Sequence, residues 1–277
     1  MSAPSGTPVI DPEPVPAAGG LFTVTRTHFP AWAVPAGHLL LLGHCITRLK
    51  TLFNPMVRLV FLRQVHYVGV DGMRAIAVLA LAVGALLVTE ATSLLGATNS
   101  YLYDMLGWAL VTEAAPLLVA VVVIGRSATS MATELSLMKV RGEMRYLEQM
   151  RIDPRDYVVL PRIAALTASL LAATIYFQAI AIVGGFGACA LLLPVSFTDQ
   201  MGLMLEAISP LKVMLAGAKT LIFGLVVGTI ACFAGLYAGH TINDVPRAQL
   251  TAYMRSLIWV VAIDFTFALA TFSFSTD

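Results

Sequence analysis

The sequence predicts an all-α integral membrane protein with about five transmembrane helices preceded by an amphipathic interfacial helix. This prediction rests on the composition, the spacing of apolar stretches and the distribution of Lys and Arg. Of 277 residues, 58% are hydrophobic and 12% are charged, against about 25% charged in an average soluble domain. A chain with this few charged side chains cannot cover a protein surface that faces water. We therefore expect its surface to face the lipid bilayer. A net charge of +1 gives no reason to expect nucleic acid binding.

The apolar stretches set the number of spans, because a spanning helix needs about 20 mostly apolar residues. Stretches of this kind cover residues 73–95, 106–124, 157–193, 213–237 and 257–274. The third is longer than one span requires, so it tilts or extends beyond the bilayer. An odd number of spans places the two termini on opposite sides.

The positions of Lys and Arg predict the orientation. Basic residues gather before the first span, between residues 126 and 162, and after the fourth span. The connections 96–105 and 194–210 contain neither Lys nor Arg. This alternation predicts a cytoplasmic N-terminus and a C-terminus outside.

Three regions are expected along the chain. Residues 1–37 are Pro-, Ala- and Gly-rich, which is typical of a disordered tail. Residues 38–67 form the interfacial region, in which apolar side chains repeat at helical spacing opposite a basic face that includes Arg58 and Arg63, and Pro55 kinks or breaks the run. A calmodulin-like target or a short soluble helix is the alternative for this region. Residues 68–277 form the transmembrane domain.

Motifs for covalent chemistry are missing from the sequence. There is no P-loop, no zinc-protease motif and no nucleophile elbow. The three cysteines lie far apart in apolar stretches, without the spacing of a metal site. We therefore expect no enzymatic activity, no cofactor and no metal site in this chain.

The segment from Arg126 to Arg162 alternates in charge and is expected to be a cytoplasmic loop. Within it, residues 142–150 predict a short helix with Met144 and Leu147 toward one side. Asp153 and Pro154 then resemble an N-cap followed by proline at the first helical position. The short helix is either a surface for a soluble partner or part of a solvated loop that satisfies the positive-inside rule.

Charged side chains also fall inside the predicted spans, where charge is costly and is usually paired or faces a cavity. They are Glu90, Glu113, Lys219 and Asp264. Two interpretations remain open: a polar lining or latch of a lipid path, and structural ion pairs or neutral carboxyl groups. Glycines recur on the fourth span at 224, 228, 235 and 239, which predicts close helix packing, either within one chain or between two copies.

Several spaced motifs occur together in order and resemble the MlaE/YrbE permease family. The residues that carry the resemblance are Glu113, Pro116, Gly125, Arg126, Glu134, Asp153, Pro154, Pro161 and Arg162. The similarity extends over residues 63–274. Thr112 stands where the family usually has Arg, Ala115 and Ser136 replace glycines, and Arg141 to Glu143 departs from the family's coupling region.

The resemblance implies a multi-pass permease of the bacterial inner membrane that moves phospholipids or other hydrophobic molecules across the envelope. It implies partners: a cytoplasmic ABC ATPase that binds ATP and Mg, an MCE-domain protein, often a STAS-domain protein, and a second permease copy or paralogue. The helix 142–150 would dock on the ATPase through Glu143, Met144, Arg145 and Leu147. An ion-coupled secondary transporter or channel, and a membrane scaffold, are the alternatives. The lipid carried and the direction of transport stay open.

Overall fold

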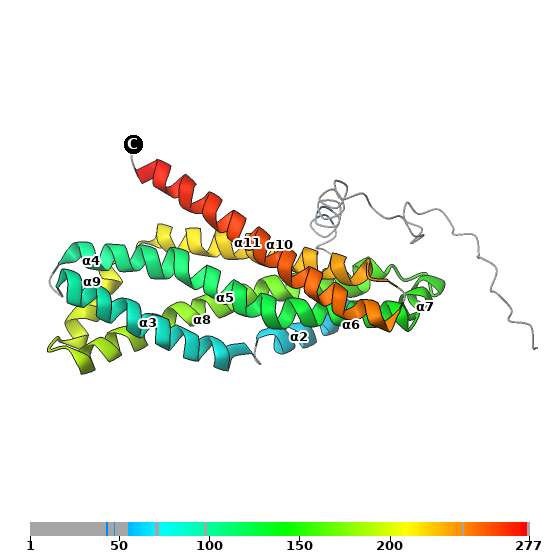
Figure 1. The fold of residues 1–277 in the computed structure, drawn as a ribbon, viewed down its shortest axis with the longest axis horizontal. Coiled ribbons are helices and arrows are strands. Elements are labelled where there is room, and N and C mark those ends of the chain that lie inside the picture. The colour runs from blue at the N-terminus through cyan, green and yellow to red at the C-terminus, as the bar shows by residue number, and fades with distance from the viewer. Residues whose placement is uncertain are drawn as a thin grey trace, which may run out of the picture.

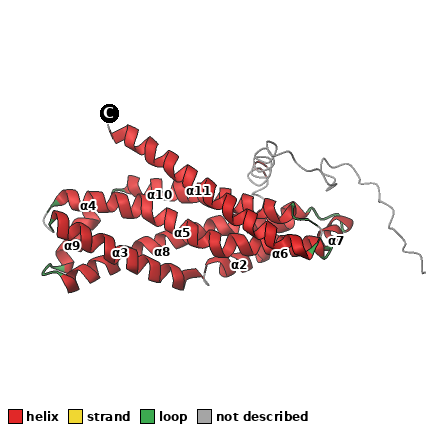
Figure 2. Cartoon of the chain, in the orientation of Figure 1, coloured by secondary structure: helices red, strands yellow, loops and turns green. Residues whose placement is uncertain are grey.

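In the computed structural model the described residues are 55–69, 72–96, 99–239 and 241–275, with Gly43 and Thr47 as isolated positions. Every regular element in these ranges is helical, and none is a strand (Figure 2). The predicted N-terminal tail, residues 1–37, lies outside the described residues. So does most of the predicted interfacial region before Pro55.

Five helical segments in the described residues are long and apolar enough to cross a membrane, which confirms the predicted all-α membrane fold. They cover Met73–Leu95, Tyr101–Val140, Arg155–Leu192, Pro210–Leu236 and Ile242–Thr271. The corresponding main helices are α3 (Met73–Leu95), α5 (Ala115–Val123) with its extensions, α8 (Leu160–Leu192), α10 (Pro210–Leu236) and α11 (Val245–Ser275). They run along the long axis of the molecule, and the C-terminal half of α11 diverges from the others (Figure 1).

The second span is one continuous helical rod of about 60 Å at 1.5 Å per residue. It joins α4 (Ser100–Leu106), π-helix η3 (Gly107–Ala114), α5, π-helix η4 (Ile124–Ala128) and α6 (Thr129–Val140). The prediction of a loop from Arg126 onward was therefore wrong for α6. No glycine or proline occurs between Gly125 and Val140, so nothing in the local sequence ends the helix there.

Short elements connect the spans. After α6, Gly142 adopts a left-handed φ of 78°, which starts a turn into α7 (Glu143–Gln149). This helix matches the predicted helix 142–150. π-helix η5 (Arg155–Val159) leads into α8, helix α9 (Phe197–Ala207) follows α8, and the 3-10 turn η6 (Ile242–Asp244) precedes α11.

Glycines permit the closest helix contacts, and these contacts lie within one chain. A Cβ at Gly84 of α3 would collide with the backbone of Ala181 on α8, and a Cβ at Gly224 of α10 would lie 2.6 Å from Thr167 Cα. Two of the other predicted glycines, Gly228 and Gly235, face α8 and α6 in the same way. Packing within one chain, the first of the two predicted uses of these glycines, is therefore observed.

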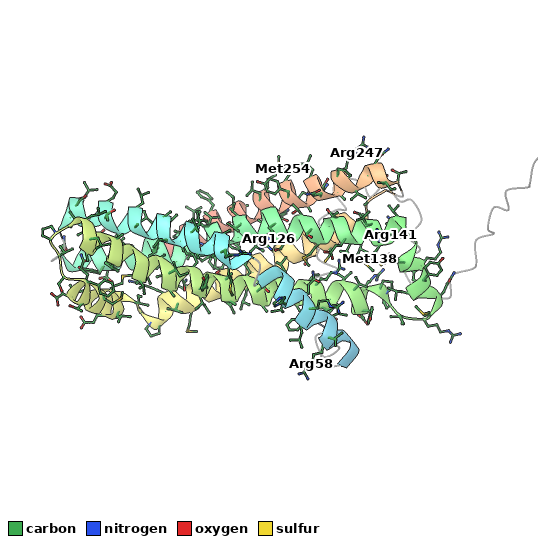
Figure 3. The ribbon with its side chains drawn as sticks, turned by 90° about the horizontal axis from the view of Figure 1, so that it is seen from below. Arg58, Arg126, Met138, Arg141, Arg247 and Met254 are labelled. Carbon is green, nitrogen blue, oxygen red and sulfur yellow. The ribbon has the colours of Figure 1, made fainter. Side chains whose placement is uncertain are left out.

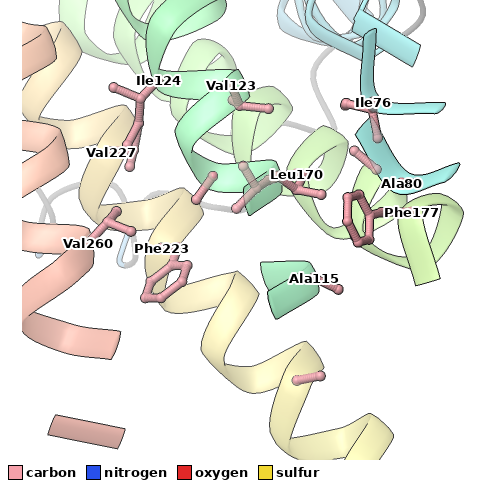
Figure 4. Close-up of a cluster of buried hydrophobic side chains, with 14 of the residues drawn as sticks. Ile76, Ala80, Ala115, Val123, Ile124, Leu170, Phe177, Phe223, Val227 and Val260 are labelled. Atoms are coloured by element: carbon pink, nitrogen blue, oxygen red, sulfur yellow. The ribbon is translucent and has the colours of Figure 1, made fainter. Parts of the chain in front are cut away.

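The buried apolar core lies where α3, α5, α8, α10 and α11 meet. Phe177 and Leu170 of α8 face Ile76 and Ala80 of α3, and Phe223 of α10 lies nearer to Val260 of α11 (Figure 4). This core contains side chains from every span. Its packing therefore fixes how the helices are aligned along their axes, and so which polar side chains face each other.

Helix α2 (Pro55–Gly69) packs along α8. Ser169 Oγ donates to the carbonyl oxygen of Val65 at 3.4 Å, and Pro55 is the first residue of the helix. Arg58 and Arg63 are exposed, as predicted for the basic face. One face of α2, which includes Gln64 and Val65, therefore contacts the protein, whereas Leu59 and Leu62 are exposed. The position of α2 in the membrane interface stays a prediction.

Candidate functional site

Lys219 of α10 is the centre of a buried charge cluster that we define as Glu113, Lys219 and Asp264. Its side chain is 1% exposed, and its Nζ lies 2.6 Å from Glu113 Oε2 and 2.7 Å from Asp264 Oδ1. The three residues belong to η3, α10 and α11, which are parts of three different spans. The structure thus brings together three of the four predicted intramembrane charges.

The fourth, Glu90, does not join the cluster. It is exposed near the C-terminal end of α3, where its carbonyl oxygen accepts a hydrogen bond from Ser93 Oγ at 2.8 Å. A position near the end of a span allows its carboxylate to reach the polar headgroup layer.

Pro116 explains why the helix around Glu113 is irregular. Proline has no N–H, so the carbonyl groups four and five residues before it, Thr112 and Val111, lose that intrahelical donor. Gln178 Nε2 of α8 donates to Val111 O at 3.0 Å, and Lys219 Nζ lies 3.4 Å from Thr112 O. Neighbouring spans therefore satisfy the carbonyl groups that the proline frees, as is typical within a membrane.

The cluster holds two carboxyl groups against one ammonium group. With both carboxylates ionised its net charge is −1, and their side chains are 26% (Glu113) and 17% (Asp264) exposed, whereas Lys219 is enclosed. An ammonium group buried this deeply needs a close anion, because desolvation without a partner is expensive. Chemically, the arrangement can lock α11 onto α10 and η3, and breaking either ion pair would loosen the contact between the three spans.

A further ion pair, outside the cluster, joins α6 to α8. Arg162 Nη2 lies 3.2 Å from Glu134 Oε2 and 3.9 Å from Met138 Sδ. Both charged residues belong to the motif that suggested the family, although nothing in their spacing predicted that they would meet. Pro161 lies in the first turn of α8 beside Arg162.

The remaining motif residues shape the ends of helices. Gly125 and Arg126 lie in η4. The Arg126 side chain reaches the start of α3, since its Nη1 would lie only 3.2 Å from a Cβ placed on Gly72. Asp153 Oδ1 accepts the N–H of Arg155 at 2.9 Å, and Pro154 is the first residue of the following helix. The predicted N-cap is therefore observed.

Sequence reasoning missed two polar contacts. One is the contact of Gln178 with Val111. In the sequence, Gln178 stands out only as a lone amide side chain within an apolar span. The other is Lys139, whose Nζ donates to the carbonyl oxygens of Leu236 at 2.9 Å and Ala238 at 2.6 Å, at the end of α10. A lysine at this position satisfies carbonyl groups that a helix end leaves without partners.

Helix α7 presents fewer of the predicted contact residues than expected. Met144 and Leu147 are half-buried and pack against the chain's own core, while Arg145 is exposed. Tyr146 and Met150, which are 64% and 62% exposed, are the apolar side chains available to a partner. Glu143 lies 3.8 Å from Arg141 in an exposed pair.

Comparison with known proteins identifies the family. The sequence profile described as "Permease MlaE" matches residues 61–270. The chain is 25% identical to a probable ABC transporter permease protein of Rickettsia prowazekii, over 75% of this chain and 81% of that protein. It is 28% identical to a probable ABC transporter permease protein of Synechocystis, over 74% of this chain and 78% of the relative. It is 26% identical to the intermembrane phospholipid transport system permease protein MlaE of Haemophilus influenzae, over 76% of this chain and 84% of that protein. Since the matched residues include α3 to α10, most of α11 and the whole charge cluster, this multi-pass membrane protein belongs to the MlaE permease family.

Proposed function

We propose that this chain is the membrane-spanning subunit of an ABC transporter that moves phospholipids or other hydrophobic molecules across the bacterial envelope. The observation that carries the proposal is the family match over residues 61–270, together with the relatives' description as ABC transporter permeases. The phospholipid substrate is supported by the name of the Haemophilus relative. ATP and Mg would be bound by a separate ATPase, with an MCE-domain protein and a STAS-domain protein as further partners.

Helix α7 is the contact that we assign to the ATPase. It lies at one end of the bundle (Figure 1) and follows a glycine turn. It exposes Arg145 and Tyr146, and Met150 is exposed directly after it. Met144 and Leu147 of α7 pack against the buried core, and α7 also contacts α6. A displacement of α7 by the ATPase would therefore be passed on to α6.

The lipid path would lie between two copies or paralogues of the permease. Large apolar side chains on α11 are exposed, among them Ile258, Trp259 and Phe265. Such a surface requires apolar surroundings, which a second permease and acyl chains supply. A bound lipid is stabilised by about 0.8 kcal/mol per buried methylene, and a change in the cavity that removes this burial releases it.

The buried charge cluster is suited to control that change. Asp264 ties α11 to Lys219, and Glu113 ties η3 to the same ammonium group. A movement of α11 away from α10 must separate Lys219 from Asp264, with Glu113 left to neutralise the lysine. The cluster is then a latch with two anions, of which one can be released.

Purification through a tag on this chain, followed by reconstitution, tests the proposal. The expected result is a complex containing an ATPase, and transfer of a fluorescent phospholipid between vesicles that requires ATP. Transfer that follows an ion gradient without ATP would replace the proposal with an ion-coupled transporter. A complex that transfers no lipid under either condition would favour a scaffold.

We also propose that the end carrying α7 is cytoplasmic, together with the N-terminus. Arg58, Arg126, Arg141 and Arg247 all lie in the half of the molecule that carries α7 (Figure 3), as the positive-inside rule requires. In a cysteine-free background, Arg145→Cys should react with an impermeant maleimide only after the membrane is opened, and Asp199→Cys should react in intact spheroplasts. The reverse pattern would invert the orientation.

A further inference from the structure

A cavity of about 320 Å³ lies between α2, α6 and α8, away from the buried charge cluster. Its lining residues are Leu59, Val60, Arg63, Gln64, Glu134 and Arg162. The cavity is therefore built by three segments that are distant in the sequence and meet at the end of the bundle nearer α7.

Two of its side chains carry buried donors without acceptors. Arg162 is 9% exposed and Gln64 is 8% exposed. Arg162 uses Nη2 for Glu134, but its Nε and Nη1, and Gln64 Nε2, reach no acceptor among the described residues. Buried N–H groups are nearly always hydrogen-bonded in native proteins, so three such groups at one cavity indicate a ligand rich in acceptor oxygens.

The charge of the lining restricts the ligand further. The lining contains the guanidinium groups of Arg63 and Arg162 and the carboxylate of Glu134, so its net charge is +1 and it favours an anion. Beside the cavity, the outer face of α2 exposes Leu59 by 65% and Leu62 by 54%, which is unfavourable in water. A ligand that matches both features carries an anionic oxygen-rich group and an apolar tail.

We propose that this cavity binds the phosphate group of a membrane phospholipid, with Arg162, Gln64 and Arg63 as donors and the acyl chains lying along Leu59 and Leu62. Glu134 then orients Arg162 and lowers the affinity for the anion through its own charge. The proposal does not depend on the transported substrate, since the cavity is separate from the cluster and its ligand is a component of the surrounding bilayer.

The test measures binding of a short-chain phosphatidylglycerol to the full-length protein in detergent, with inorganic phosphate and a diacylglycerol of equal chain length as the comparison probes. Arg63→Gln should weaken binding about fivefold, because one charge-assisted hydrogen bond is lost at an exposed position. Arg58→Gln is the matched control, since Arg58 is exposed on the same helix but does not line the cavity and points away from the bundle (Figure 3). It should leave the affinity within about twofold.

Glu134→Gln separates a ligand site from a structural ion pair. As a ligand site, the cavity should bind the phospholipid more tightly once the carboxylate charge is gone. Unchanged or weaker binding by Glu134→Gln, in a variant that elutes as a folded monodisperse protein, overturns the proposal. So does equal loss in the two arginine variants, equal binding of the diacylglycerol, or inorganic phosphate competing at the concentration of the lipid.

Discussion

The Lys219 ammonium group lies 2.6 Å from the Glu113 carboxylate, and this contact joins α10 to the π-helical segment of the second span. Asp264 approaches the same nitrogen from α11 at 2.7 Å. Lys219 is thus the shared partner of two anions, and either one alone can neutralise it. This redundancy makes the energetic coupling between the two carboxylates a measurable property.

We expect Glu113→Gln and Asp264→Asn to destabilise the protein by about 1 kcal/mol each, whereas the double variant should lose about 3–5 kcal/mol, because an uncompensated charge is then buried. Unfolding in mixed micelles provides the measurement. Asp104→Asn is the control: Asp104 pairs with Lys212 at 3.1 Å but is 65% exposed, so about 0–1 kcal/mol is expected. Additive losses in the double variant would show that the two carboxylates act independently.

Gln178 should be necessary only while Pro116 is present. Gln178→Leu leaves the carbonyl oxygen of Val111 without its donor, and a cost of about 1–2 kcal/mol is expected. Pro116→Ala returns an N–H to the helix, so the double variant should recover much of this stability. The same micelle unfolding checks it, and a double variant as unstable as Gln178→Leu would contradict the explanation.

On α7, Tyr146→Asp should reduce capture of the ATPase at least about tenfold, because an exposed aromatic anchor is lost. Leu147→Asp should instead lower the yield of folded permease, since Leu147 packs on the chain's own core. Glu148→Ala, on the exposed side of the same helix, is the control and should change capture little. Pull-down from detergent extracts, normalised to inserted permease, measures all three. Full capture by Tyr146→Asp would move the contact to another surface.

Two glycines of α8 should respond differently to the same substitution. A Cβ at Gly185 would lie 2.7 Å from Gly84 O, whereas a Cβ at Gly187 meets nothing within 4 Å. Gly185→Ala should therefore destabilise the α3–α8 pair by about 1–3 kcal/mol, and Gly187→Ala should not destabilise the protein. Thermal unfolding of the two variants in the same detergent makes the comparison, and equal midpoints would refute the close approach.

The sequence by itself determined the elements whose signal is local. Runs of apolar residues predicted the spans, since a bilayer requires about 20 such residues whatever surrounds them. The short helix near 142–150 and the helix start at Asp153 and Pro154 were also predicted, because proline fixes its own φ and lacks an N–H, which suits the first turn of a helix. The ordered motif from Glu113 to Arg162 indicated the family that the comparisons confirm.

Tertiary structure decided which polar groups meet. Glu113, Lys219 and Asp264 were recognisable as costly charges, but their pairing depends on how η3, α10 and α11 are rotated and aligned, which no local pattern encodes. The partners of two charged residues of α6 were likewise set by packing, since Glu134 pairs with Arg162 of α8 and Lys139 donates to carbonyl groups at the end of α10. Partners distant in the sequence thus supply what a lone helix would need from solvent, and only their three-dimensional packing reveals it.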